Sequence, residues 1–176
     1  MVMKVTMAIV ASLDGRLTRG VEPNIYNWTS VEDQASFSAL IAKHKLIVMG
    51  RQTYEAARQR IKLTPDKLRL ILTRNPRQYA AKQVAGQLEF TAESPLALIK
   101  RLEGAGYRSL LLVGGQINTL FLEAGLVDEI YWTVEPLIFG AGQKLVADQL
   151  LDTKLKLVSS KRLNQRGTLL LYYKVI

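Results

Sequence analysis

The stretch from Leu110 to Leu122, LLLVGGQINTLFL, decides how this chain folds. Its first four residues are apolar and have the length of a buried strand, and two glycines separate them from a helical pattern. Glycine permits a sharp turn and lets a ligand approach the main chain closely. The free N–H groups of the new helix would point back at that turn, with the positive end of the helix dipole behind them. Gly114 and Gly115 therefore form either a site for an anion such as phosphate or simply a tight turn.

Apolar segments on both sides of this stretch predict further strands. Before it, short apolar runs bounded by polar residues, glycine or proline predict strands at residues 4–13, 46–50, 68–73 and, more briefly, 87–91. After it, residues 130–134 predict another strand. Residues 154–163 and 168–176 then predict an antiparallel hairpin around a turn at 164–167.

Helix signals lie between these strands. Ser30 has the features of an N-cap for a helix that ends near Lys43. The expected buried face of that helix comprises Val31, Phe37, Leu40 and Ile41. A short helix is expected from Arg51, and Ser94–Pro95 begins another. The alternation predicts one α/β domain over residues 1–176, with a mostly parallel central sheet, helices on its faces and a C-terminal antiparallel hairpin.

The composition excludes several classes of function. The chain has no cysteine and one histidine, His44, so a disulfide framework, a cysteine nucleophile and a Cys/His zinc site are all excluded, and we expect no metal. We see neither a signal peptide nor an apolar run of membrane-spanning length, and we expect a cytoplasmic protein without a membrane partner. The net charge of +9 is scattered along the sequence. This pattern favours anionic small molecules over nucleic acid.

Three predicted strands end in glycines, hydroxyls or arginines, and ligands of open α/β sheets bind at such carboxyl ends. Together these ends could hold a dinucleotide. Gly114 and Gly115 would take the pyrophosphate, because backbone N–H groups at a helix start bind phosphate. An adenosine phosphate could be held by Arg51, Thr53, Thr73 and Arg74. The glycine pattern alone is a weak signal, because G-x-G-x-x-G is absent.

Asp33 is the carboxylate of greatest interest for chemistry. It follows Trp28 by five residues, in the first turn of the helix capped by Ser30. As a proton relay it would suit the reduction of a C=N bond, in which one proton accompanies one hydride. Ser30-x-x-Asp33 also resembles a capping box with Asp in place of Glu. From spacing alone, capping is the commoner use of such an acid.

In their order and spacing, several motifs of this chain together resemble the dihydrofolate reductase-like superfamily. More narrowly, the chain resembles the reductase domain of riboflavin biosynthesis and its stand-alone relatives. The motifs that carry the resemblance are Ser12-Leu13-Asp14-Gly15, Trp28-Thr29-Ser30 with Glu32-Asp33, residues 49–55 (MGRQTYE), Leu72-Thr73-Arg74, Val113-Gly114-Gly115 and residues 124–129 (AGLVDE). The resemblance implies a three-layer dihydrofolate reductase-like fold and an NADPH-dependent reductase.

The resemblance also implies roles for individual residues. Asp33 falls at the position of the active-site carboxylate of dihydrofolate reductases, and Thr133 falls at the threonine linked to it. The resemblance would place phosphates of the cofactor on Gly50, Arg51 and Thr53. The 2′-phosphate of the cofactor would lie at Thr73 and Arg74, and the pyrophosphate at Gly114, Gly115 and Gln116. With the resemblance in view, we expect Asp33 to be catalytic as well as a capping residue. A small-molecule substrate and a homodimer are further expectations.

This chain departs from the riboflavin branch after the second strand. That branch carries Ala-Asp-Asp-Pro there, whereas this chain has Tyr54-Glu55-Ala56-Ala57, which is closer to the folate enzymes. The zinc deaminase of the bifunctional riboflavin enzyme is missing. We therefore expect hydride transfer from NADPH to a phosphorylated aminopyrimidine, with a dihydrofolate-like pterin as the alternative substrate. A nucleotide-binding protein without turnover is the alternative of another class.

Overall fold

A computed structural model describes residues 3–146 and 150–176 of the chain. Residues 1–2 and 147–149, which belong to the single predicted domain, lie outside the described part. The helices are α1 (Val31–Lys43), α2 (Arg51–Ala57), α3 (Pro95–Gly104) and α4 (Gly115–Glu123), with 3₁₀ turns η1 (Ile25–Asn27) and η2 (Pro76–Lys82). The strands are β1 (Lys4–Ser12), β2 (Leu46–Gly50), β3 (Leu68–Leu72), β4 (Leu88–Thr91), β5 (Ser109–Val113), β6 (Glu129–Glu135), β7 (Leu155–Arg162) and β8 (Leu169–Val175).

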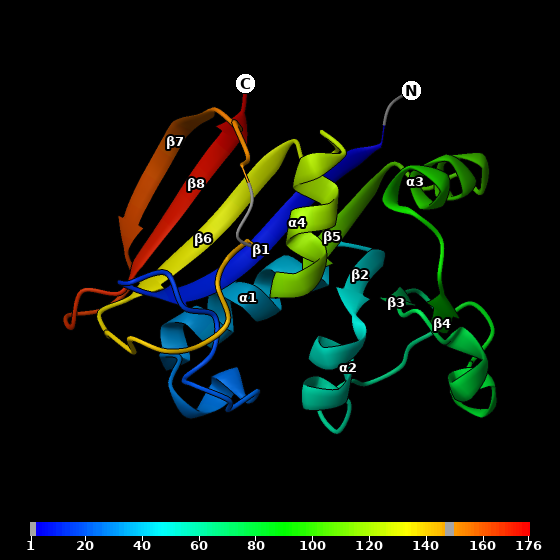
Figure 1. Ribbon diagram of the computed structural model, residues 1–176, viewed down its shortest axis with the longest axis horizontal. Coiled ribbons are helices and arrows are strands. Elements are labelled where there is room, and N and C mark those ends of the chain that lie inside the picture. Colours follow the sequence, from blue (N-terminus) through cyan, green and yellow to red (C-terminus); the bar gives the residue numbers. More distant parts are fainter. Residues whose placement is uncertain (1–2, 147–149) are drawn as a thin grey trace.

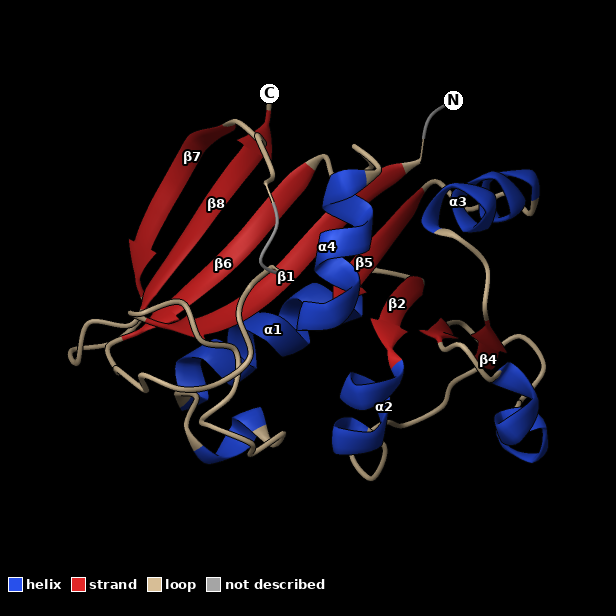
Figure 2. Ribbon diagram, in the orientation of Figure 1, coloured by secondary structure: helices blue, strands red, loops and turns tan. Residues whose placement is uncertain are grey.

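These strands form one sheet in the order β4-β3-β2-β5-β1-β6-β8-β7. All pairs from β4 to β6 are parallel, and β8 and β7 add an antiparallel edge. Figures 1 and 2 show the hairpin at one end of the sheet and α3 at the other, with α4 lying across the central strands. The α/β class, the mostly parallel sheet and the C-terminal hairpin predicted from the sequence are confirmed.

Helices cover both faces of the sheet, which gives three layers. On one face, α3 and α4 pack against the central strands through Leu98, Leu102, Ile117 and Phe121, all at most 4% exposed. On the other face, α1 contributes Phe37, Leu40 and Ile41, which remain half-buried. The looser packing of α1 leaves room for a cleft between this helix and the sheet.

One part of the predicted helix face is wrong. Val31, expected to be buried, is 72% exposed, whereas Asp33 is only 5% exposed. Val31 is the first residue of α1, next to the Ser30 cap, so its side chain precedes the turn that contacts the sheet. The first turn of α1 thus directs a carboxylate, rather than an apolar side chain, toward the protein interior.

The strand register places rows of side chains across the α1 face. One row comprises Arg69, Ile47, Leu111, Thr6 and Glu129. The next row, two residues nearer the carboxyl ends of the strands, comprises Ile71, Met49, Val113, Ala8 and Tyr131. Two residues further on, Thr133 pairs with Val10, while Thr73, Arg51 and Gly115 follow the ends of their strands. This last row contains most of the strand ends predicted to bind the cofactor.

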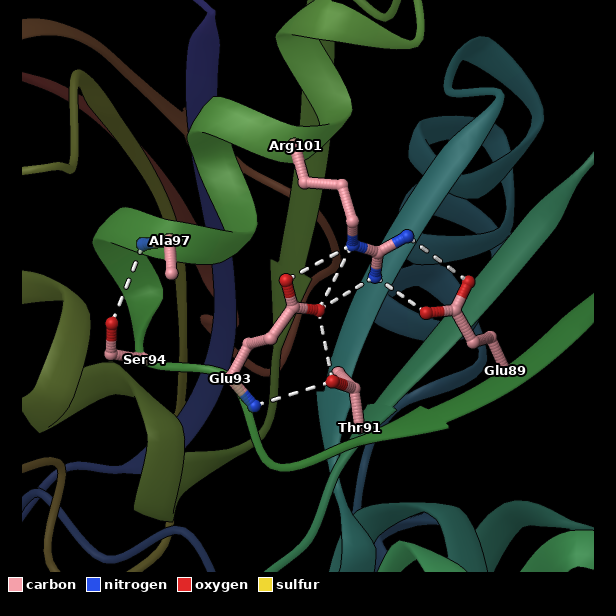
Figure 3. A network of polar contacts seen from close by, with 6 residues as sticks. All are labelled: Glu89, Thr91, Glu93, Ser94, Ala97 and Arg101. Atoms are coloured by element: carbon pink, nitrogen blue, oxygen red, sulfur yellow. Dashed lines mark hydrogen bonds and ion pairs between the residues drawn. The ribbon is translucent and has the colours of Figure 1, made fainter.

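Ser94 begins α3 as predicted, and an ion-pair network ties this helix to the sheet. The Ser94 side chain accepts a hydrogen bond from the Ala97 N–H at 3.4 Å, with Pro95 at the first helical position. Arg101 binds Glu93 at 2.8 Å and also pairs with Glu89 on β4 (Figure 3). The network links α3 to β4, the edge strand at this end of the sheet.

The turn η2 was not predicted from the sequence. Tyr79 of this turn stacks on Phe90 of β4, with ring centroids 4.5 Å apart.

Among the described residues, no helix has the length and apolar character needed to span a membrane.

Candidate active site

The Ser30 cap and the buried side of α1 position Asp33. The Ser30 side chain accepts a hydrogen bond from the Asp33 N–H at 3.2 Å, which confirms the predicted N-cap. The Asp33 carboxyl itself faces β6, where it forms a hydrogen bond with Thr133, a side chain only 3% exposed. The backbone of Asp33 therefore completes the cap while its carboxyl is available for another role.

Burial raises the pKa of the Asp33 carboxyl to about 6. The hydrogen bond with Thr133 opposes this shift, and the negative charge of Glu135 adds to it. A carboxyl that titrates near neutral pH can hold a proton and release it to a bound molecule. Thr133 fixes the orientation of that carboxyl.

Glu135 is a residue of the site that the sequence analysis did not identify. It is 3% exposed and accepts the backbone N–H of Ser30 at 2.7 Å. Its second oxygen accepts the hydroxyl of Thr168, also at 2.7 Å, next to the hairpin turn. Glu135 thus joins the start of α1, the end of β6 and the β7–β8 hairpin. In the sequence, Glu135 is an acid at the end of an apolar run and directly precedes Pro136. This pattern indicated only where the strand ends.

The turn from β5 into α4 packs so closely against neighbouring side chains that neither of its glycines could carry a side chain without a shift. Gly114 has φ +106°, and a Cβ there would lie 2.2 Å from Thr53 Oγ1. A Cβ on Gly115 would lie 2.4 Å from Leu17 Cδ1. Gly114 is the N-cap of α4 and makes no side-chain capping bond, in contrast to Ser30 and Ser94. This geometry fits the predicted pyrophosphate site, because the cap residue of α4 supplies no acceptor for the first backbone N–H groups of that helix.

The other predicted cofactor residues follow neighbouring strands at the same edge. Gly50 ends β2, and Arg51 and Thr53 lie in the first turn of α2; Met49 of β2 pairs with Val113 of β5. A cleft of about 1490 Å³ is lined by Asp33, Thr133, Arg51, Thr53, Gly114, Gly115 and Gln116. Catalytic and cofactor candidates from four separate segments therefore share one cleft.

Three predicted residues do not line this cleft. Gly50 is buried behind it, and a Cβ there would lie 3.2 Å from Ile117. Thr73 and Arg74 follow β3, one strand beyond β2, and Arg74 is exposed. Their position next to Arg51 along the edge would suit the far end of an extended cofactor. The Thr73 hydroxyl accepts the N–H of Asn75 at 3.3 Å.

Two loops close over the Gly114–Gly115 turn. The Leu17 N–H donates to the Gln143 carbonyl at 2.8 Å, and the Gln143 N–H donates to the Thr18 hydroxyl at 2.8 Å. Asp14 accepts the backbone N–H groups of Phe139 and Gly140 at 3.0 and 2.8 Å. These contacts place the loop after β1 over the site.

Asp14 and Trp28 hold this cover in place. The Ser12 hydroxyl and the two loop N–H groups lower the pKa of Asp14 to about 2, so it stays ionised. Trp28, at the start of the α1 segment, contacts Phe139 edge to face with centroids 5.1 Å apart. Trp28 is 7% exposed, so it is packed between the loops rather than presented to a substrate.

The fold and the site define a class of α/β proteins that bind a ligand across the carboxyl ends of parallel strands, beside a buried carboxylate. Residues 3–169 match the family model of the RibD C-terminal domain, so the chain belongs to the RibD C-terminal domain family. Two Bacillus subtilis relatives are uncharacterized. YwjB is 26% identical over 168 residues, covering 92% of this chain and 93% of YwjB, and YyaP is 21% identical over 179 residues.

Solved structures share the fold. A riboflavin biosynthesis protein from Shewanella superposes with a TM-score of 0.76 at 21% identity, over 99% of both chains. Acinetobacter baumannii RibD superposes with a TM-score of 0.78 at 20% identity, and this chain spans 58% of its length. A deaminase/5-amino-6-(5-phosphoribosylamino)uracil reductase from Thermotoga maritima gives 0.72 at 15% identity, with 57% of its length spanned. At these identities the likeness establishes the fold.

Proposed function

We propose that this protein is a reductase that uses NADPH to reduce a pyrimidine-type substrate, most closely a phosphoribosylaminouracil. The observation that carries the proposal is the shared cleft. It joins a buried carboxyl with a pKa of about 6 to an uncapped helix start and a glycine turn. The family and the reductase named for the Thermotoga relative support the same reaction class.

The protein's part in the reaction is positioning and proton transfer. Gly114, Gly115 and Gln116 would bind the pyrophosphate, and Arg51 and Thr53 further phosphate oxygens, with Gly50 allowing close packing behind them. The cofactor supplies the hydride when it is bound. The protonated Asp33 carboxyl would donate its proton to the substrate nitrogen as the neighbouring carbon accepts the hydride. Thr133 would hold the carboxyl in the required orientation.

Preference for NADPH over NADH would come from the end of β3. Arg74 is exposed and Thr73 half-buried, next to the strand that carries Arg51. A guanidinium and a hydroxyl at this position would bind the additional 2′-phosphate.

A pterin is the second candidate substrate. The segment that follows β2 favours this alternative. There Tyr54 is buried against Tyr79 and Phe90, and the chain lacks the Asp-Asp-Pro that the riboflavin branch carries at this position. A third possibility is nucleotide binding without turnover.

We further propose a homodimer that acts in the cytoplasm on a small molecule, without nucleic acid or membrane partners. Every residue of β7 is exposed, including Leu157 and Val158 at 50% and 48%. This edge strand, with its exposed apolar residues Leu155, Leu157 and Val158, is the surface we expect a second copy to cover. A second apolar stretch, Leu137-Ile138-Phe139, is less suitable as a contact surface, because Phe139 packs on Trp28.

The test is NADPH oxidation by the purified protein, followed at the nicotinamide absorbance band. The substrates are 5-amino-6-(5-phosphoribosylamino)uracil and dihydrofolate, assayed separately. Oxidation with the aminouracil supports the proposal, and oxidation with dihydrofolate alone supports the pterin alternative. NADPH binding without oxidation by either substrate would contradict both proposed reactions.

A further inference from the structure

Arg69 is a buried cation whose role the proposed reaction leaves unexplained. It lies on β3, in the row that continues through Ile47, Leu111 and Thr6 to Glu129, and its side chain lines the cleft. Arg69 is 8% exposed, yet its Nη1 has no hydrogen-bond partner within the described part of the chain. Burial lowers the pKa of its guanidinium, although arginine remains charged in proteins.

An unpaired buried charge destabilises a folded protein. The C-terminal end of α1 could in principle offset this cost through its carbonyl groups. Lys67 already occupies that position, with its Nζ donating to the carbonyls of Ile41 at 2.7 Å and His44 at 2.5 Å. Within residues 3–146 and 150–176, Asp66 is the acid whose charge raises the pKa of Arg69, and this effect is weaker than that of burial. The structure therefore gives Arg69 no internal partner that explains its burial.

The cleft that Arg69 lines also contains Lys43 and His44, at the C-terminal end of α1. The acid in this row, Glu129, lies four strands away from β3. Its carboxylate accepts bonds from Thr6 at 2.7 Å and Tyr172 at 2.6 Å and pairs with Lys4 at 2.8 Å. Since Glu129 is already fully bonded, no free carboxylate in the row competes for Arg69.

We propose that Arg69 anchors a subsite for an oxyanion, a phosphate or carboxylate group of the ligand that occupies the cleft. A guanidinium binds such groups through two parallel hydrogen bonds, and a desolvated guanidinium binds them more strongly. Arg69 lies on β3, four strands from β6, whose Thr133 meets Asp33, a separation of roughly 19 Å at the usual strand spacing. The ligand would therefore be elongated, with its anionic group far from the carboxyl that protonates it. This last step rests on the proposed function, whereas the anion subsite itself does not.

The experiment is a titration of the full chain, labelled with ¹⁵N-arginine, with inorganic phosphate and separately with acetate. The Arg69 Nε–Hε resonance is assigned by its loss in Arg69→Met. We expect this resonance to shift saturably with at least one of the two anions, and the more tightly bound anion identifies the ligand group. An Arg69 resonance that moves with neither anion would overturn the subsite. Phosphate bound at Gly114–Gly115 would leave that resonance unmoved, which separates the two sites.

Thermal unfolding of the variant gives a second readout. Arg69→Met removes an unpaired buried charge, so we expect its Tm in the absence of anions to rise by about 2–4 °C. Phosphate should raise the Tm of wild type more than that of Arg69→Met. The matched control, Arg77→Met, changes an exposed arginine. Its Tm without anions and the rise in its Tm with phosphate should both equal those of wild type. A fall in the Tm of Arg69→Met would assign the guanidinium a structural role and refute the proposal.

Failure of the subsite and failure of the reductase would be distinguishable. If NADPH binds and is oxidised while the Arg69 resonance stays fixed, the subsite is wrong and the reductase stands. If NADPH does not bind but the resonance shifts, the anion subsite stands without the reaction.

Discussion

The two roles of Asp33, in the helix cap and in the reaction, use different atoms. Its N–H completes the Ser30 cap, and its carboxyl meets Thr133 inside the protein. Asp33→Asn should keep the cap, the side-chain volume and nicotinamide binding, while lowering the hydride-transfer rate by roughly 10²–10⁴-fold, the usual effect of a general acid. Single-turnover kinetics measure this rate. Asp152→Asn, at an exposed position, is the control, and an Asp33→Asn rate equal to wild type would leave Asp33 as a cap alone.

The raised pKa of Asp33 also predicts how rate and stability depend on pH. If the protonated carboxyl is the active form, the hydride-transfer rate should fall as pH rises through about 6. The native state binds this proton more tightly than the unfolded chain, where the pKa is 3.8. The stabilisation from Asp33 is therefore fully present below pH 3.8 and lost as pH rises through about 6. By linkage, the loss is up to about 3 kcal/mol.

Asp33→Asn cannot ionise, so it should exceed wild type in the free energy of unfolding at pH 8. At pH 8 the difference in free energy of unfolding between Asp33→Asn and wild type should approach the linkage value given above, and near pH 4 it should disappear. Urea unfolding at pH 8 and pH 4 provides the measurement. The same difference between variant and wild type at both pH values would show that Asp33 does not titrate as described.

At the scale of elements, Glu135 connects α1, β6 and the C-terminal hairpin. In Glu135→Gln the amide nitrogen cannot accept the Thr168 hydroxyl, so we expect a loss of about 1–3 kcal/mol in the free energy of unfolding. Removing the charge of Glu135 should also lower the pKa of Asp33, because that charge now raises it. The pH profile of hydride transfer should then shift to lower pH. Lost stability with an unchanged profile would mean that Glu135 acts only as a structural link.

The turn between β5 and α4 is the second element on which the account depends. Gly114→Ala places a side chain at φ +106° and against Thr53, so it should destabilise the protein by about 1–3 kcal/mol and weaken nicotinamide binding. Gly104→Ala is the matched control. Its φ is not positive, and a Cβ there meets nothing within 4 Å. Thermal unfolding and a nucleotide titration together provide the measurement, and normal binding by Gly114→Ala would move the cofactor away from this turn.

At the scale of the whole molecule, apolar patterning predicted the sheet and most helices, because each buried strand is a nearly continuous apolar run. The face of α1 was predicted only in part. Val31 fitted the helical period, but as the first residue of α1 it is exposed, whereas Asp33, two residues later in the same turn, is buried against β6. Sequence spacing carries no information about which side chains meet across the sheet. Glu135 and Arg69 therefore gave no distinctive signal.

The candidate site was predicted better at its glycines than at its polar partners. A glycine between a strand and a helix indicates a turn locally, as at Gly114. The closing loops depend on contacts between distant segments, such as Asp14 with Gly140, which sequence spacing does not predict. Membership of the RibD C-terminal domain family fixes the architecture, whereas the roles of Asp33, Thr133 and the cofactor residues remain predictions.

The cofactor site at the strand ends is tested most directly by titrating the purified protein with NADPH and with NADH and following the fluorescence of the bound nicotinamide. We predict saturable binding of NADPH and weaker binding of NADH, with a smaller difference between the two in Arg74→Gln and unchanged affinity in Asp33→Asn. Absence of saturable binding by either nucleotide would contradict the assignment of the strand ends as a cofactor site, and with it the proposed reduction.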